Sequence, residues 1–291
     1  MTTRVRRYGD HVPRILVTND DGVDAVGLHR LVAAALPHGE VTVVAPASEY
    51  SGAGAAVGPL HLTLPDVADV SSAPQFAGTV GAYAVSGPPA LCVVYAALGA
   101  FGPPPDLVVS GINPGANVGR AVYHSGTVGA VLTARTRGIP GVAFSQAVVG
   151  FGVEGQGWDD VLANQRWATA EKVAGLVVGA LVAEPPEGLF ALNVNVPNLD
   201  WGDLAGWRTT EVGSIPPRAM AAARLVPKEG HVGHWSVDVH WGDVVPLPPH
   251  LDGGAVEAGF VSVSWLGGLG AVDAAPNAVH DMFDRLLGPA G

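Results

Sequence analysis

The feature that most constrains the fold is an apolar run that ends abruptly in two neighbouring carboxylates. Residues 14–22 read RILVTNDDG, so three consecutive apolar residues are followed closely by Asp20 and Asp21. A continuous apolar run is typical of a strand buried on both faces, as in a parallel sheet covered by helices. In an open α/β sheet, ligands bind at the carboxyl ends of the strands. The run therefore predicts a buried strand whose end carries a binding site.

The pair Asp20 and Asp21 permits two interpretations. Adjacent ionised carboxylates repel each other, and a cation between them removes that cost. An Asn-Asp-Gly sequence is also common in turns, where its side chains only cap the next helix. These residues alone are compatible with either a metal site or a simple turn.

The composition limits the classes of function. The chain has 291 residues, of which 48% are hydrophobic and 14% charged, and this balance argues against a disordered protein. The formal net charge of -11 is unfavourable for wrapping a nucleic-acid backbone. We therefore expect a small-molecule substrate and no stable nucleic-acid partner. Cys92 is the single cysteine, which excludes an intramolecular disulfide and a cysteine-based zinc site.

Neither end of the sequence nor its interior suggests a membrane or export. The arginines near the start are not followed by an apolar stretch, so they do not form a secretory signal. The longest apolar run, residues 173–183, is too short to span a bilayer. We therefore expect a cytoplasmic protein without a membrane partner.

Strand and helix patterns alternate along most of the chain, which is typical of a parallel sheet covered by helices. Strands are expected over residues 41–44, 80–86, 106–110, 141–145, 189–196 and 259–264, and helices over residues 26–36, 87–98, 125–137 and 159–183. Residues 234–240 instead alternate between polar and apolar side chains, which predicts a hairpin arm. No internal repeat or low-complexity linker is present, so we expect one domain with a projecting arm.

Three expected strand ends carry small polar residues that suit a hard divalent cation. Asp20 and Asp21 follow the first strand, Ser51 follows the second, and Asn113 follows the strand over residues 106–110. Mg²⁺ and Mn²⁺ prefer carboxylate, hydroxyl and amide oxygens, completed by water. These four side chains could supply such a ligand set.

The expected helix start at Ser125, Gly126 and Thr127 suits an anion. Backbone N–H groups and two hydroxyls at a helix N-terminus favour phosphate, and the same groups serve in ordinary capping. A cation beside such a cradle indicates phosphate-ester chemistry, because the metal orients phosphoryl oxygens and lowers the pKa of a bound water. His124 lies next to this segment and could protonate the leaving alkoxide or be merely structural.

Together these motifs resemble the SurE (survival protein E) family of metal-dependent 5'/3'-nucleotidases. The matching segments are residues 15–23, 44–46 with 51–53, 106–113, 125–128, 192–197 and 255–256 with 259–264. The resemblance implies a three-layer Rossmann-like α/β fold with a mostly parallel central sheet and a projecting C-terminal β-hairpin arm. It implies a single domain over residues 1–291, with a core at about 14–200 and 253–291 and an assembly arm at about 201–252.

The resemblance also implies an activity and a set of site residues. The expected enzyme is a divalent-metal-dependent phosphomonoesterase that hydrolyses nucleoside monophosphates to nucleoside and phosphate, as a homodimer or homotetramer. One Mg²⁺ or Mn²⁺ ion in each subunit would be bound by Asp20, Asp21, Ser51 and Asn113. Asp20 and Asp21 would be the catalytic carboxylates. The phosphate would be held by Gly52, Ser125, Gly126 and Thr127.

Two segments depart from the family pattern and leave the substrate open. Residues 47–50 read ASEY where a polar or basic run is usual, and Leu91 stands where an acid is typical. A dedicated phosphorylated metabolite of a biosynthetic pathway is therefore an alternative substrate. A catalytically silent nucleotide-binding protein is an alternative of another class. An aspartyl nucleophile at Asp20 is a further option, although its second acid normally follows after one intervening residue.

Other residues have simpler explanations. His231, His234 and His240 have spacings that a second metal could use, but in a hairpin arm we expect them to be exposed. Cys92 lies in an apolar helix, where a buried inert thiol is expected. The sequence contains no Walker-type phosphate loop, no Gly-x-Ser-x-Gly elbow and no complete dinucleotide fingerprint.

Overall fold

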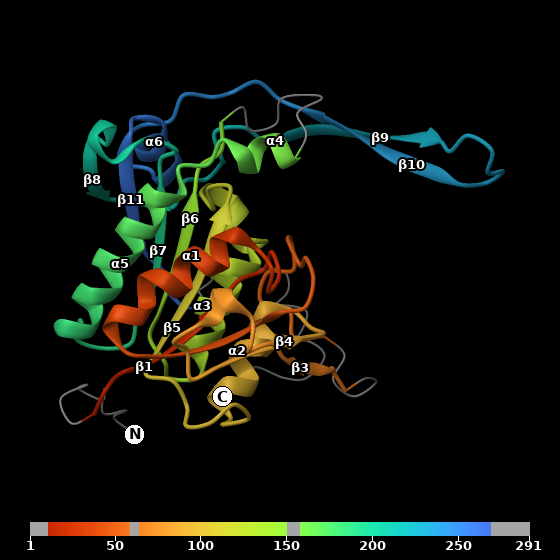
Figure 1. Cartoon of the computed structure of the whole chain (residues 1–291). Helices are drawn as coiled ribbons and strands as arrows, with labels where there is room; N and C mark the ends of the chain where they lie inside the picture. Colours follow the sequence, from red (N-terminus) through yellow and green to blue (C-terminus); the bar gives the residue numbers. More distant parts are fainter. Residues whose placement is uncertain (1–10, 59–63, 150–157, 269–291) are drawn as a thin grey trace, which may run out of the picture.

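A computed structural model describes residues 11–58, 64–149 and 158–268, and a nine-stranded sheet forms the centre of this part of the chain (Figure 1). From one edge to the other, the strands are β3 (Val67–Asp69), β4 (Gly81–Val85), β2 (Glu40–Pro46), β1 (Arg14–Thr18), β5 (Leu107–Pro114), β6 (Gly141–Gln146), β7 (Ala191–Val196), β11 (Phe260–Trp265) and β8 (Gly206–Thr209). Among these strands, β3 with β4 and β7 with β11 pair antiparallel, and the other neighbours pair in parallel. The mostly parallel sheet confirms the predicted fold class.

Helices cover both faces of the sheet and make a three-layer structure. On one face α1 (Val26–Ala35) packs against α5 (Trp167–Ala183), and on the other α2 (Pro89–Ala97) packs against α3 (Gly126–Thr136). Successive residues of β1 serve the two layers in turn. Ile15 joins the hydrophobic cluster that contains the residues of α1 and α5, whereas Leu16 joins the cluster of α2 and α3. This two-sided burial explains why β1 reads as a continuous apolar run.

The long helix expected over residues 159–183 is interrupted, so this prediction is wrong in detail. The structure has α4 (Trp158–Ala163), a break, and then α5. The break is held by Asn198, whose side chain accepts the N–H of Arg166 at 2.8 Å and donates to the carbonyl of Asn164 at 3.1 Å. The helix loses its continuity because a distant side chain binds the backbone groups that would continue it.

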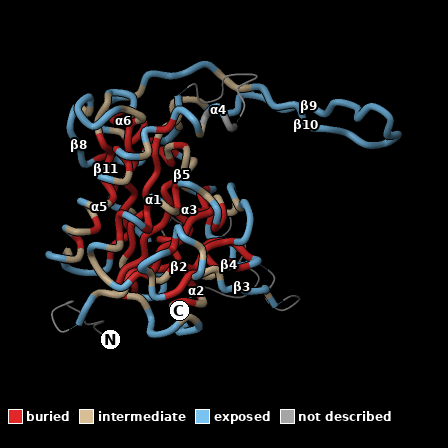
Figure 2. Tube along the Cα trace, viewed as in Figure 1, coloured by how far each residue is buried: buried red, intermediate tan, exposed pale blue. Residues whose placement is uncertain are grey.

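The arm is a two-stranded antiparallel hairpin of β9 (Met220–Pro227) and β10 (Trp235–Trp241), and it projects from the body of the molecule (Figure 1). Figure 2 shows buried residues throughout the sheet and its helices, whereas the hairpin is exposed along almost its whole length. The predicted hairpin is therefore confirmed. The projecting part is shorter than residues 201–252, because β8 joins the main sheet and α6 (Asp252–Glu257) packs on β11.

Short 3-10 helices complete the described elements. They are η2 (Leu36–His38), η3 (Pro74–Phe76), η4 (Gly119–Tyr123) and η5 (Trp201–Asp203).

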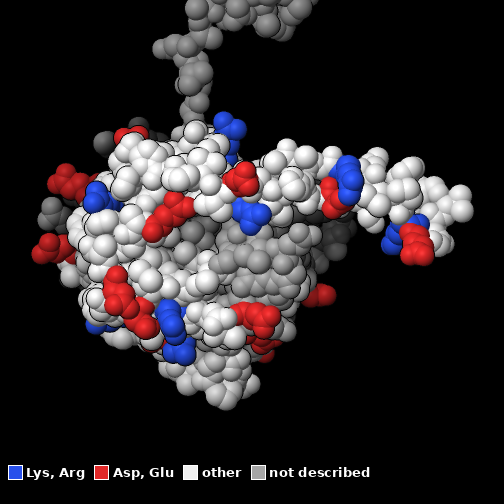
Figure 3. Space-filling view, turned by 90° about the horizontal axis from the view of Figure 1, so that it is seen from above, with Lys and Arg blue, Asp and Glu red and all other residues white. Residues whose placement is uncertain are grey.

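Within the described ranges, no helix combines the length and the apolar character that crossing a bilayer requires. On the face seen in Figure 3, most of the described lysines and arginines stand apart from one another and beside an acidic residue.

Candidate metal and phosphate site

The candidate site lies at the carboxyl ends of β1, β2 and β5. β1 pairs in parallel with β2 on one side and with β5 on the other, so the ends of the three strands meet at one edge of the sheet. Asn113 lies inside β5 rather than after it, where a register shift between Ser110 and Asn113 interrupts the pairing with β6. The sequence places these side chains at strand ends, and the parallel register brings the ends together.

Asp20 lies at the centre of the site. Its side chain is buried, and its Oδ1 accepts the hydroxyl of Thr127 at 2.5 Å. The same hydroxyl lies 3.3 Å from Oδ1 of Asn113. A Cβ atom on Gly126 would lie only 2.7 Å from Cβ of Asp20, so the absence of a side chain there allows α3 to approach. The structure thus brings together Asp20, Asn113, Gly126 and Thr127.

Ser125 begins α3 as the sequence predicts. Its hydroxyl accepts the N–H of Val128 at 3.1 Å, which is the capping hydrogen bond expected of a serine at this position. The capped N-terminus of α3 faces Asp20 through the side chain and the backbone of Thr127. An N-terminus that faces a carboxylate in this way stabilises negative charge at that place.

Several buried polar atoms around Asp21 have no hydrogen-bond partner within the described part of the chain. They are Oδ2 of Asp21, Oδ1 of Asn19, the hydroxyl of Thr18 and the hydroxyl of Ser110. Thr18 is the last residue of β1, with Asn19 and Asp21 just after it, and its register partner Ser110 lies inside β5, so these atoms belong to one region of the sheet. Buried polar atoms normally have partners, and oxygen atoms left without one at the same edge fit a bound cation or ordered water.

The electrostatics of the two carboxylates also fit a cation. Burial raises the pKa of Asp20, and the hydrogen bonds from Thr127 partly offset this. Burial raises the pKa of Asp21 well above its usual value, and the charges of Asp20 and Glu49 raise it further. A divalent cation would favour the ionised form of both groups. The donor set therefore suits Mg²⁺ or Mn²⁺.

Ser51 lies in the loop after β2, next to Asp20 in space. The N–H of Tyr50 donates to the carbonyl of Asp20 at 2.7 Å. This hydrogen bond fixes the loop against residues 19–22, called here the acidic turn. The Ser51 hydroxyl itself is exposed and donates to Oε1 of Glu49 at 2.5 Å. Gly52 has a φ of +83°, a conformation that favours glycine, with open space where a side chain would stand.

Two comparisons with known proteins identify the family. A family model described as Survival protein SurE matches residues 15–216, which is more than half of the chain. The chain belongs to the SurE family. The crystal structure of the SurE protein from Aquifex aeolicus is similar, with 29% identity and a TM-score of 0.68, over 94% of this chain and 99% of that chain. Both findings confirm the family and the fold that the sequence predicts.

SurE family membership indicates a metal-dependent phosphatase or nucleotidase. The individual roles of Asp20, Asp21, Ser51, Asn113 and the phosphate cradle stay predictions. Of the two departures from the SurE pattern, Leu91 lies in the first turn of α2, where it is almost fully buried. Residues 47–50 lead directly into Ser51, and the N–H of Tyr50 binds the carbonyl of Asp20, so this departure adjoins the candidate site.

Sequence reasoning missed two acidic residues that bind loops of the candidate site. Glu49 holds Ser51, and the signal that could have found it is an acid two residues before an expected ligand. Asp252 is buried, and its carboxylate accepts the N–H of Gly119 at 2.8 Å and of Gly213 at 3.0 Å. Gly119 belongs to the loop that joins Asn113 to Ser125, so Asp252 anchors that loop from the far end of the chain.

A second buried network holds the same loop. The carbonyl of Asn117 accepts the side-chain amides of Asn193 at 2.9 Å and Asn195 at 3.2 Å, and its N–H donates to Oδ1 of Asn195 at 2.7 Å. These two asparagines alternate with apolar residues in β7, which is the signal that could have found them. Their amides fix the loop between Asn113 and Ser125 to the sheet.

The histidines and the cysteine take the places expected of them. His124 is exposed and its carbonyl accepts the N–H of Gly54 at 3.0 Å, and a role in proton transfer stays a prediction. His231, His234 and His240 are exposed in the arm, and the described residues contain no group of three or more His, Cys, Asp or Glu arranged to hold a metal. Cys92 is buried, and burial raises the pKa of its thiol, as expected of an inert cysteine.

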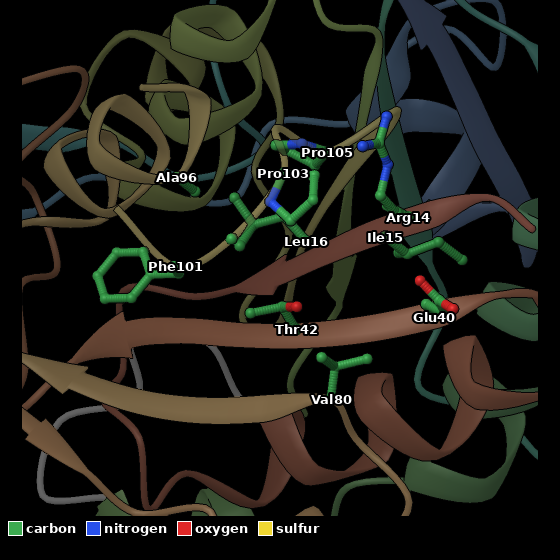
Figure 4. Close-up of a pocket in the computed structure, with 11 residues that line it drawn as sticks. Arg14, Ile15, Leu16, Glu40, Thr42, Val80, Ala96, Phe101, Pro103 and Pro105 are labelled. Atoms are coloured by element: carbon green, nitrogen blue, oxygen red, sulfur yellow. The ribbon is translucent and has the colours of Figure 1, made fainter. Parts of the chain in front are cut away.

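A pocket lies at the other end of the strands, where β1 and β2 begin. It is lined by Arg14, Glu40 and Thr42 at the starts of β1 and β2, and by Phe101 and Pro103 in the loop after α2 (Figure 4). These residues lie at the amino ends of the strands, so the pocket is separated from Asp20 by the length of β1. It therefore takes no part in the candidate site.

Proposed function

We propose that the protein is a divalent-metal-dependent phosphomonoesterase that hydrolyses nucleoside monophosphates to nucleoside and phosphate. The observation that carries the proposal is the meeting of Asp20, Asn113 and Thr127 at the N-terminus of α3. Oxygen donors suited to a hard cation adjoin there a helix start suited to a phosphate. SurE family membership supports the same chemistry.

In this proposal the residues divide into two groups. Asp20, Asp21, Ser51 and Asn113 would hold one Mg²⁺ or Mn²⁺ ion in each subunit. When bound, such an ion supplies Lewis-acid chemistry and a water of lowered pKa. The Gly52 backbone and the start of α3 at Ser125, Gly126 and Thr127 would orient the phosphate. A carboxylate of the ligand set, such as Asp20, would accept the proton of the attacking water.

The arm supports a homo-oligomer, either a dimer or a tetramer. Leu225, Trp235 and Val237 on the hairpin are each more than half exposed, at 65%, 57% and 62%. Exposed apolar side chains on a projecting hairpin favour burial against another subunit. The molar mass in solution, measured by light scattering after gel filtration, should be two or four times 29.5 kDa. A monomer at micromolar concentration would contradict this part of the proposal.

Release of inorganic phosphate from a substrate panel tests the activity. The panel contains 5'- and 3'-nucleoside monophosphates together with phosphorylated sugars and other non-nucleotide esters, each with Mn²⁺, Mg²⁺ or EDTA. Asp20→Asn should lower kcat roughly a thousandfold, because several kcal/mol of transition-state stabilisation depend on the bound metal. Asp200→Asn, at an exposed surface ion pair, is the matched control and should retain activity. Undiminished hydrolysis in Asp20→Asn would exclude the proposed mechanism, and a strong preference for a non-nucleotide ester would exclude the proposed substrate.

A further inference from the structure

The loop between β2 and residue 58 carries an acidic residue whose contacts point to the metal site. Oε1 of Glu49 accepts two hydrogen bonds from Ser51, one from its hydroxyl at 2.5 Å and one from its N–H at 3.0 Å. Both residues are exposed, so water competes for these groups. The Ser51 hydroxyl still points its hydrogen at the Glu49 carboxylate, because charge-assisted hydrogen bonds are short and comparatively strong.

The loop is itself fixed against the acidic turn. The N–H of Tyr50 donates to the carbonyl of Asp20, and the N–H of Val23 donates to the carbonyl of Pro46, both at 2.7–2.8 Å. The backbone of Ser48 lies 3.3 Å from the place that a Cβ on Gly22 would occupy. The residues on the two sides of Glu49, Ser48 and Tyr50, are therefore held close to the turn that carries Asp20 and Asp21.

Resting on the proposed function, we propose that Glu49 is a positioning residue of the cation site. Its carboxylate accepts the hydrogen bond of the Ser51 hydroxyl, which leaves the lone pairs of Oγ to the cation. A hydroxyl has one proton and two acceptor lone pairs. A hydroxyl that binds a metal through oxygen must direct its proton elsewhere, and Glu49 is the acceptor that the structure provides. Hydrogen bonds of this kind, from ligands to a second layer of acceptors, orient metal ligands in proteins.

Glu49 also adds a negative charge beside the two aspartates. Burial is the main cause of the raised pKa of Asp20 and of Asp21, and the charge of Glu49 adds to the rise in both. Without a cation this third charge is unfavourable, and with a divalent cation it becomes attractive. Both effects of Glu49, the orientation of Ser51 and the added charge, strengthen cation binding.

Binding of Mn²⁺ to the protein without substrate, followed by calorimetry and by the loss of the free-ion EPR signal, tests the proposal. Glu49→Ala should weaken the affinity for Mn²⁺ by about tenfold or more, the range found when partners of metal ligands are removed. Glu49→Gln keeps an acceptor oxygen for Ser51 and should lose less. Glu40→Ala is the matched control, because Glu40 is also exposed and lies at the other end of the strands. This control changes the net charge by the same amount and should bind Mn²⁺ as the wild type does.

A double-mutant cycle with Ser51→Ala separates positioning from charge. If Glu49 acts through Ser51, the loss caused by Glu49→Ala should largely disappear in the Ser51→Ala background. An equal loss in both backgrounds would mean that the charge acts alone and would overturn the positioning role. Unchanged affinity in Glu49→Ala, beside abolished binding in Asp20→Asn, would overturn this inference and leave the proposed function intact. Equal binding by the wild type and Asp20→Asn would instead overturn the proposed site itself.

Discussion

At its first residue β1 meets the carboxylate of Asp106, and just beyond its last residue the chain carries Asp20 and Asp21. Asp106 accepts hydrogen bonds from the guanidinium of Arg14 at 2.9 and 3.0 Å and from its N–H at 3.0 Å, and Nε2 of His11 lies 2.8 Å away. At the other end, Oδ2 of Asp21 has no partner among the described residues, and Asp20 is held by Thr127. The strand thus has a paired acidic end and an unpaired acidic end.

The pKa values express the same difference. Burial alone would raise the pKa of Asp106, but the hydrogen bonds and charge of Arg14, with His11, outweigh it and hold the pKa at about 2. Burial raises the pKa of both Asp20 and Asp21, and no cationic side chain in the described ranges offsets it. The comparison separates two uses of a carboxylate. Asp106 has its counter-charge on Arg14, whereas Asp20 and Asp21 have no such counter-charge among the described residues.

The largest expected effect is the loss of the paired end. Asp106→Asn should lower the free energy of unfolding by about 3 kcal/mol, because it leaves the Arg14 guanidinium without its partner. Urea denaturation measures this change, and Asp200→Asn at an exposed pair should cost less than about 0.5 kcal/mol. Hydrolysis by the remaining folded Asp106→Asn protein should be unchanged. If Asp106→Asn lost activity without losing stability, Asp106 would not have the structural role assigned to it.

Acid should remove the contribution of Asp106 to the stability of the fold. Because the pKa of Asp106 is about 2 in the folded protein and 3.8 ordinarily, its contribution is complete above pH 4 and is lost as pH falls towards 2. The contribution amounts to about 2 kcal/mol. Denaturation at a series of pH values should show this loss in the wild type and a flatter profile in Asp106→Asn. Parallel profiles for the two proteins would assign the acid sensitivity to other groups.

The smallest expected effect is a gain in stability rather than a loss. Asp21→Asn should raise the stability of the metal-free protein at neutral pH by about 1 kcal/mol, because it removes the repulsion between neighbouring acids. Excess Mn²⁺ should raise the Tm of the wild type by mass action and have little effect on the Tm of Asp21→Asn. Thermal unfolding with and without Mn²⁺ measures both. A marked destabilisation of metal-free Asp21→Asn would show that the unpaired end is structural as well.

Much of the fold can be predicted from the sequence because its signals are local. The continuous apolar run of β1, the alternation in β10 and the serine before α3 each depend on neighbouring residues only. The break between α4 and α5 depends on Asn198, which is far along the chain from the residues it binds. β8 is short and exposed, so its place beside β11 leaves no pattern in the sequence.

The site shows the same division. Asp20 and Asn113 can be predicted because polar residues at the ends of parallel strands converge at one edge. The short contact between Thr127 and Asp20 joins residues 107 positions apart, and only the fold shows it. Glu49 and Asp252 could not be assigned roles from the sequence, because each acts through a contact, with Ser51 or with Gly119, that residue type alone does not reveal.

The carboxylate of Asp252 has a consequence for anyone who would redesign this molecule. One oxygen accepts the N–H of Gly119, in the loop that leads to Ser125, and the other accepts the N–H of Gly213, on the way to the arm. A shortened, arm-free version would have to keep the chain through Gly213 and rejoin it before Asp252. A cut made before Gly213 would remove one of the two loops that Asp252 joins, together with the hairpin.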